Sequence, residues 1–194
     1  MRVLLLTEPA MHTDPTDTRL ARLVGAVAPL GDVTLLLAGD IGSLNVQRIA
    51  AWTGVTELLV ATHPTRTDGS AEQIAAWIVA LAGQFSHIAA ATSTLGAAVM
   101  PRVAAMLDRP LLTGVQTICS ADTFVRPVLT GNALATVRVH GTPVCLTLQP
   151  AGFTPAQPHT PTTASIRHLT PAATIHAQWA RLLTCTPIPP SKRP

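Results

Sequence analysis

The sequence of 194 residues predicts a three-layer α/β/α fold with a mainly parallel, Rossmann-like sheet, and three observations support this. Short apolar runs alternate with amphipathic runs through the first 120 residues, which is typical of βαβ units. The apolar runs are nearly continuous, as expected for strands that are buried on both faces. After residue 120 the links between apolar runs become too short for crossover helices, which predicts an antiparallel β-meander.

The elements expected in the first part of the chain alternate strictly. Strands at 2–7, 32–39, 56–62 and 87–93 are each followed by a helical run, at 18–27, 43–52, 70–83 and 94–108 in turn. Ser43 and Ser70 are suited to cap the second and third helices, and Gly83 is suited to end the third. Pro101 lies inside the fourth, where it is expected to kink the helix or to begin its regular part.

Four strand-like runs then follow closely: LLTGVQTIC, DTFVRPVL, ALATVRVH and PVCLTL. At least the last three are predicted to pair antiparallel. Pro127 cannot donate a ladder hydrogen bond, which places its strand at an edge or a bulge. From residue 150 onward, where nine of the seventeen prolines lie, one helical run at 172–183 interrupts an extended segment. We therefore expect an α/β domain over 1–150 and a Pro/Thr-rich tail and linker over 151–194.

Composition narrows the class of protein. Hydrophobic residues make up 47% of the chain and charged residues 12%, so the chain buries most of its surface or hides part of it against a partner. No apolar stretch reaches the roughly 20 residues of a membrane helix. We expect a soluble, cytoplasmic protein without membrane insertion. Cys119, Cys145 and Cys185 have no metal-ligand spacing and are expected to be reduced thiols.

Charge is divided unevenly along the chain. Residues 1–122 hold all ten acids and carry a net charge of −3, whereas residues 123–194 hold six bases and no acid. These bases lack interleaved aromatic side chains, so we expect no nucleic-acid partner. A solvated face and docking onto an acidic partner surface both stay open. The seven histidines show no helical pairing, and no metal site is predicted.

One segment is a candidate ligand site. The chain has none of the usual phosphate-loop, hydrolase or metalloprotease motifs, so no catalytic residue is assigned. ATSTLG (91–96) lies where the fourth strand ends and a helix begins, which is the ligand crevice of open α/β sheets. Ser93, Thr94 and Gly96 are therefore candidates to bind a nucleotide through backbone N–H groups. Alternatively, Ser93 or Thr94 is an N-cap and Gly96 permits close packing of helix on sheet.

The hairpin RPVLTGNALATV (126–137) is a candidate contact surface. Gly131 and Asn132 tolerate a left-handed backbone, and the small side chains after them let another layer approach. Arg126, Gly131 and Asn132 are the candidate residues for contact with a neighbouring subunit or domain. Packing within the domain is the alternative, and Arg126 could equally cap a carbonyl edge.

These two segments resemble the amino-terminal domain of the electron transfer flavoprotein α subunit. The helix pattern G-x-x-x-x-P-R-x-A-A-x-L matches at Gly96, Pro101, Arg102, Ala104, Ala105 and Leu107. The hairpin pattern D-x-F-x-R-P-hydrophobic-x-G-N-A-hydrophobic-A-T-V matches at Asp122, Phe124, Arg126, Pro127, Gly131, Asn132, Ala133, Ala135, Thr136 and Val137. The final SKRP is similar to the start of the family's linker before its flavin-binding domain. The likeness covers residues 1–150 and the last few residues.

The resemblance implies a scaffold and partner-binding role. In the family, α and β subunits form a heterodimer that carries electrons from acyl-CoA dehydrogenases and similar flavoenzymes, as in fatty acid oxidation, to a quinone-linked acceptor. The FAD is held mainly by the carboxyl-terminal domain of the α subunit, and none of its signatures maps onto 1–194. We therefore expect an electron-carrier domain, not an enzyme, with no cofactor of its own. A β subunit, and possibly a separate FAD-binding domain, are the expected partners. The tail departs from the family pattern because it has no acids.

Two other functions stay open. The first is a free-standing sensor of the related adenine-nucleotide α-hydrolase-like architecture, which would bind AMP or ATP at the end of the fourth strand. The second is a hydrolase or transferase, for which the sequence supplies no set of nucleophile, base and orienting group.

Overall fold

A computed structural model describes residues 1–8, 18–38, 46–61, 70–158 and 164–169. Within them, one large sheet is built from the strands β1 (Arg2–Thr7), β2 (Asp32–Ala38), β3 (Val55–Ala61), β4 (His87–Ala91), β5 (Leu111–Val115), β9 (Val144–Leu148) and β10 (Ser165–Leu169). Their order across the sheet is β10-β3-β2-β1-β4-β9-β5, and every neighbouring pair is parallel. The predicted parallel sheet is confirmed.

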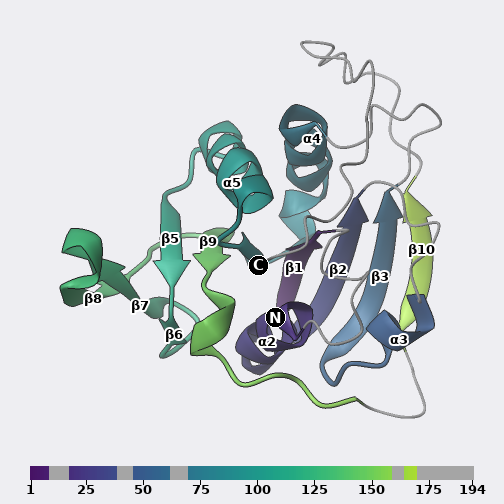
Figure 1. Ribbon diagram of the computed structural model, residues 1–194. Helices are drawn as coiled ribbons and strands as arrows, with labels where there is room; N and C mark the ends of the chain where they lie inside the picture. The colour runs from purple at the N-terminus through teal and green to yellow at the C-terminus, as the bar shows by residue number, and fades with distance from the viewer. Residues whose placement is uncertain (9–17, 39–45, 62–69, 159–163, 170–194) are drawn as a thin grey trace, which may run out of the picture.

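Helices cover both faces of this sheet (Figure 1). They are α2 (Arg19–Val27), α3 (Val46–Ala50), α4 (Ala71–Leu81) and α5 (Thr94–Met106). Alternate residues of a strand point to opposite faces, so Leu5 of β1 packs with α2 and α3 in one apolar cluster. Leu4 and Leu6 pack with α4 and α5 in the other. The predicted three layers are confirmed.

Local signals set the starts of the helices. Oγ of Ser70 accepts a hydrogen bond from the backbone N–H of Gln73 at 3.2 Å, which confirms the predicted cap of α4. This helix ends at Leu81 and is followed by a short 3-10 turn, η2 (Ala82–Gln84), that contains Gly83. Ser43 lies outside the described residues, as does the helical run predicted at 172–183.

A small antiparallel sheet leaves the large one after β5. It consists of β6 (Thr117–Ile118), β7 (Thr123–Val128) and β8 (Ala133–Arg138), in that order. The predicted antiparallel pairing of DTFVRPVL with ALATVRVH is confirmed by β7 and β8. Beyond the two residues of β6, β8 is the only described strand that pairs with β7, so Pro127 lies at a local edge as predicted.

The prediction that PVCLTL pairs antiparallel is wrong. This run forms β9, which lies between β4 and β5 and is parallel to both, with Val144 beside His87 and Cys145 beside Leu111. A short link predicts antiparallel neighbours only when both strands belong to one sheet. Here β7 and β8 leave the large sheet, so the chain returns from β8 to pair with strands that are distant in sequence.

The segment after β9 crosses one face of the molecule. Another 3-10 turn, η4 (Pro150–Gly152), leads to residues 153–158, which pack against α2. The backbone N–H of Ala156 donates to the carbonyl oxygen of Ala21 at 2.8 Å. Gly25 permits this approach, because a Cβ atom there would lie 2.1 Å from the carbonyl oxygen of Thr154. The chain then adds β10 beside β3. The division at residue 150 stays a prediction.

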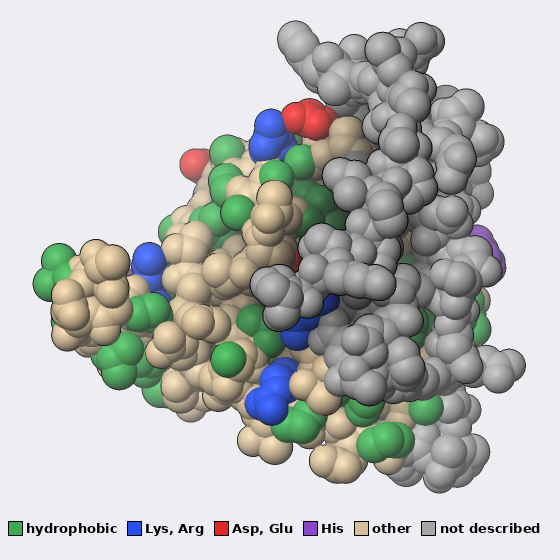
Figure 2. Space-filling model, viewed as in Figure 1, with side chains coloured by type: hydrophobic (Ala, Val, Ile, Leu, Met, Phe, Trp, Pro, Cys, Tyr) green, Lys and Arg blue, Asp and Glu red, His purple; other side chains and the backbone are tan. Residues whose placement is uncertain are grey.

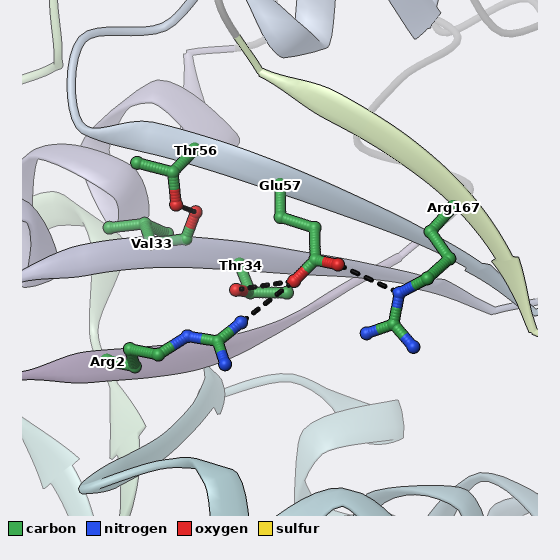
Figure 3. A network of polar contacts seen from close by, with 6 residues as sticks. All are labelled: Arg2, Val33, Thr34, Thr56, Glu57 and Arg167. Carbon is green, nitrogen blue, oxygen red and sulfur yellow. Dashed lines mark hydrogen bonds and ion pairs between the residues drawn. The ribbon is translucent and has the colours of Figure 1, made fainter.

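A polar network joins β10 to the sheet (Figure 3). Glu57 of β3 accepts hydrogen bonds from Arg2 of β1 and Arg167 of β10, both at 2.9 Å, and from Thr34 of β2 at 3.4 Å. The carboxylate of Glu57 therefore connects four neighbouring strands.

Candidate functional site

The first candidate site is the crevice between β1 and β4, where the order of the strands reverses. The chain adds β2 and β3 on one side of β1, and β4 and β9 on the other. Open α/β sheets bind ligands beyond the carboxyl ends of strands at such a point. Glu8 follows β1, and Ser93 follows β4 and begins the approach to α5. The residues predicted from ATSTLG therefore lie at the switch point.

Ser93 is the N-cap of α5, and its hydroxyl group has two partners. Oγ accepts a hydrogen bond from the backbone N–H of Gly96 at 3.0 Å and donates one to Oε1 of Glu8. The interpretation of Ser93 as an N-cap is confirmed. Thr94 is the first residue of the helix and is exposed. The N–H group of Gly96 is thus already bonded within the chain.

Gly96 is the point of closest approach between α5 and β4. A Cβ atom on Gly96 would lie 2.0 Å from the carbonyl oxygen of Ala91, a separation that non-bonded atoms do not reach. Glycine is therefore needed for packing, which confirms the second interpretation of this residue.

Among the described residues, the charged group at the crevice is an acid. Glu8 interacts with Ser93 at the N-terminus of α5, where the helix dipole favours a negative group. Arg102, the first base after this segment, instead donates to Oε1 of Glu72 at 2.8 Å. A phosphate at this helix end would therefore meet a carboxylate. Sequence reasoning missed Glu8, although an acid directly after the first strand of a parallel sheet is a recognisable signal.

The second candidate site is the hairpin of β7 and β8, residues 123–138, which we call the arm. It projects beyond β5 at the edge of the molecule (Figures 1 and 2). The pairing runs from Thr123 opposite Arg138 to Val128 opposite Ala133. Because cross-strand partners share a face, Arg126 and Val128 lie on one face with Ala133 and Ala135. We call this the Arg126 face.

The arm is rooted in the core through Phe124 and His87. Phe124 is fully buried and meets the imidazole of His87 edge-on, with ring centroids 6.5 Å apart. Nε2 of His87 lies 2.8 Å from the carbonyl oxygen of Ala121 and donates to it, since a carbonyl oxygen only accepts. Burial lowers the pKa of His87, although the hydrogen bond to Ala121 acts in the opposite direction. Sequence reasoning missed this role, although a histidine at the start of an otherwise apolar strand was the available signal.

Asp122 stabilises the base of the arm through hydrogen bonds from residues at the start of β7 and the end of β8. Its carboxylate accepts hydrogen bonds from Ser120 at 2.7 Å, Thr123 at 2.8 Å and Nε of Arg138 at 2.6 Å. These three donors, with the two hydroxyl groups first, hold the pKa of Asp122 well below its usual range. Both oxygens of this carboxylate are therefore engaged.

The turn of the arm differs in detail from the prediction. Gly131 has the predicted left-handed backbone, with φ of 91°, but Asn132 is right-handed, with φ of −74°. The other left-handed residues are Leu129 and Thr130, with φ of 50° and 58°. The chain turns through the 3-10 element η3 (Leu129–Gly131). This turn begins at Leu129, whereas a Gly-Asn turn would begin at Gly131. A β-branched residue with positive φ is rare, so this turn is strained at Thr130.

Apolar side chains are exposed toward the end of the arm. Leu129 is 75% exposed and Leu134 is 65% exposed. Apolar atoms are visible at the projecting end in Figure 2. A Cβ atom on Gly131 would meet nothing within 4 Å, so the positive φ of 91°, and not close packing, accounts for the glycine at that position.

Arg126 is half-buried in the middle of the arm. Its Nε atom is shielded from solvent and has no hydrogen-bond partner among the described residues. Nε of Arg126 therefore does not cap a carbonyl group in the described part of the chain.

The remaining reactive groups form no further centre in the described part of the chain. No group of three metal-binding side chains occurs there. Burial raises the pKa of the Cys145 thiol to about 11, which makes it unreactive, and Cys119 is exposed. Cys185 lies outside the described residues. None of the described helices has the length and hydrophobicity that a bilayer crossing requires.

A three-layer α/β domain with a projecting antiparallel arm is the class of structure that the fold and these two regions define. Residues 8–174 match the family described as "Electron transfer flavoprotein domain". The chain therefore belongs to the electron transfer flavoprotein family, as its two segment patterns led us to expect.

Its relatives include several α subunits. The chain is 43% identical over 156 residues to "Electron transfer flavoprotein subunit alpha" of Paracoccus denitrificans, a match that covers 79% of this chain and 49% of the relative. It is 34% identical over 134 residues to the protein of the same name from Pseudomonas aeruginosa, covering 69% and 43%. It is 40% identical over 139 residues to "Electron transfer flavoprotein subunit alpha, mitochondrial" of Arabidopsis thaliana, covering 69% and 37%. The chain spans about half or less of the length of these relatives, and the match is to their amino-terminal half.

Proposed function

We propose that this chain is the partner-binding scaffold of an electron transfer flavoprotein α subunit. The observation that carries the proposal is the arm, which is rooted in the core at Phe124 and exposes Leu129 and Leu134 at its far end. Exposed apolar side chains on a projecting element are typical of a protein contact. In this proposal Arg126, Gly131 and Asn132 contribute to that contact.

The partner in this proposal is the β subunit of an electron transfer flavoprotein. The names of the relatives as α subunits support it, since an α subunit implies a companion chain. The scaffold supports electron transfer from acyl-CoA dehydrogenase-type flavoenzymes to a quinone-linked acceptor, and it works in the cytoplasm. No nucleic acid or membrane takes part.

The chain holds no FAD of its own in this proposal. The cofactor is bound by a region that is not part of residues 1–194, either in the same polypeptide or in a separate FAD-binding domain. The match to only the amino-terminal half of the α subunits supports this division of labour. The chain then contributes a surface and not a redox group.

The test is to mix the chain with the β subunit encoded in the same genome and to measure mass by light scattering after size exclusion. We expect a complex of one copy of each chain, formed without added FAD. A double variant, Leu129→Ser with Leu134→Ser, is expected to weaken it on the order of tenfold or more, because the apolar area that the partner would cover is lost. Met106→Ser is the matched control, because Met106 is also exposed but lies on α5. Failure of the wild-type chain to bind the β subunit would contradict the proposal.

The alternative function is an adenine-nucleotide sensor that uses Ser93, Thr94 and Gly96. The position of these residues at the switch point favours it. The bond from Gly96 to Ser93, and Glu8 beside them, count against it. Calorimetric titration of the chain with ATP and with AMP separates the two functions. We expect no binding below millimolar concentration, and micromolar binding that is lost in Ser93→Ala would favour the sensor.

A further inference from the structure

Arg126 carries a shielded N–H group for which the described residues supply no hydrogen-bond partner. A shielded guanidinium N–H without a partner is costly, because burial removes its hydration and nothing replaces it. Nε of Arg126 is in this state among the described residues. One testable explanation is that the hydrogen-bond partner of Arg126 belongs to another molecule.

The register of the arm shows what surrounds the side chain of Arg126, which is partly exposed as a whole although its Nε atom is shielded. Arg126 lies opposite Ala135, and the next pair on the same face is Val128 with Ala133. All four residues are half-buried, in contrast to the fully buried Phe124 at the root of this face. Small and apolar side chains therefore surround one cation on a face that retains some exposure.

No carboxylate in the arm is free to neutralise that cation. Asp122 is the last acid in the sequence, and three other donors engage it. The segment from residue 123 to 194 carries six bases and no acid. A negative partner for Arg126 must therefore come from the amino-terminal part of the fold, where no contact with it is found among the described residues, or from another chain.

We propose that Arg126 is the receptor for a carboxylate of the partner subunit, an aspartate or glutamate set in an apolar surface that covers the Arg126 face. This inference rests on the proposed partner-binding function and adds the chemistry of the contact. The arginine fork matches the two oxygens of a carboxylate, which a single ammonium group cannot do. The apolar neighbours Val128 and Ala133 exclude water from the pair once the partner is bound, which strengthens the interaction.

Two variants test the proposal in the complex with the β subunit. Arg126→Met keeps an unbranched stem that reaches about as far as Nε and removes the charged guanidinium group. We expect it to weaken binding on the order of 30-fold or more, as removal of one member of a shielded charge pair does. Arg138→Met is the matched control: it removes a positive charge from the same hairpin, but this charge is already paired with Asp122 within the chain. We expect it to change binding by no more than about threefold.

The isolated chain supplies an independent measurement. If Arg126 has no partner in the free chain, Arg126→Met leaves the midpoint of thermal unfolding unchanged or raises it, because the unsatisfied group is removed. A clear fall in the midpoint would mean that Arg126 has a partner within the chain, and the inference would be wrong.

The partner's carboxylate can be found by replacing each surface aspartate and glutamate of the β subunit with arginine. One such variant is expected to bind Arg126→Glu better than it binds the wild-type chain. If Arg126→Met binds the β subunit as tightly as wild type, the carboxylate receptor is refuted and the scaffold function stands. If the wild-type chain does not bind the β subunit at all, the proposed function fails and this inference fails with it.

Discussion

Gly96 shows how one missing Cβ atom decides between a ligand loop and a packing contact. A glycine at the start of a helix suits a phosphate loop and close packing equally well. In the structure the carbonyl oxygen of Ala91 occupies the position near which a side chain would lie. The neighbouring Ser93 caps the helix from within the chain.

Replacement of Gly96 by alanine is therefore expected to destabilise the fold by about 3 kcal/mol, because backbone on both sides must shift. Gly83→Ala is the control, since a Cβ atom there would meet nothing within 4 Å. We expect the control to stay within about 0.5 kcal/mol of wild type. Urea unfolding of both variants measures the difference, and equal stabilities would show that α5 packs less closely on β4 than described.

His87 links the arm to the sheet through a polar contact in an apolar setting. Burial lowers its pKa below the ordinary value of 6.5. Between the pKa of the folded state and that of the unfolded state, the unfolded chain binds more protons. The free energy of unfolding therefore rises with pH in this window, and stability is lost as the pH falls below about 6.5.

His87→Gln is expected to flatten this part of the pH dependence, because glutamine can still donate to the carbonyl oxygen of Ala121 but does not titrate. The measurement is the free energy of unfolding at several values between pH 7.5 and pH 5.0 in both proteins. The difference between the two curves isolates His87 from the other histidines. Parallel curves would mean that His87 is solvated in the folded chain.

The strand β10 depends on side chains as well as on its ladder with β3. Four of its five residues are exposed, so apolar burial contributes little to its attachment. The side chain of Glu57 is only 14% exposed and binds Arg167 of β10 and Arg2 of β1 (Figure 3). Hydrogen bonds to a shielded charge contribute more than exposed ion pairs.

Glu57→Gln is accordingly expected to lower stability by about 1–2 kcal/mol and to speed hydrogen exchange at the amides of β10. Glu72→Gln serves as the control, because Glu72 pairs with Arg102 on the more exposed surface of two helices. Its effect should stay below about 0.5 kcal/mol. A loss of stability in Glu72→Gln as large as that in Glu57→Gln would mean that the network does not secure the edge strand.

The arm and the strand after it show which elements the local sequence pattern predicts and which it does not. The alternation of β7 and β8 and the proline at the edge were readable, because they depend on neighbouring residues alone. The pairing of the following strand, β9, could not be predicted in this way, because its partners β4 and β5 are distant in sequence. The left-handed positions at Leu129 and Thr130 were missed because neither residue type favours that backbone.

Across the fold as a whole, the sequence predicted the parallel sheet, its two helical layers and the family. The hydrophobic periodicity of the strands and helices, together with the helix caps at Ser70 and Ser93, predicted the sheet and its helical layers. It did not predict that β10 extends the sheet, because that strand is short, polar and held by Glu57. It also could not reveal that Nε of Arg126 is shielded and lacks a partner in the described part of the chain, because only the assembled fold shows burial.

These features together describe a domain with a well-buried core and an arm that leaves apolar side chains exposed and a shielded arginine N–H group without a partner among the described residues. Two buried clusters fill the faces of the sheet. The arm, by contrast, combines the exposed Leu129 and Leu134 with an arginine, Arg126, whose shielded Nε atom has no partner among the described residues. A second chain that covers the arm would account for both features at once.

Hydrogen exchange of the chain, alone and mixed with the β subunit, is the measurement that tests this account. We expect the amides of residues 123–138 to become protected in the mixture, while the segment 91–96 at the switch point keeps its rate. Protection confined to the switch point, or no change at the arm in a mixture that has formed a complex, would contradict a partner-binding arm.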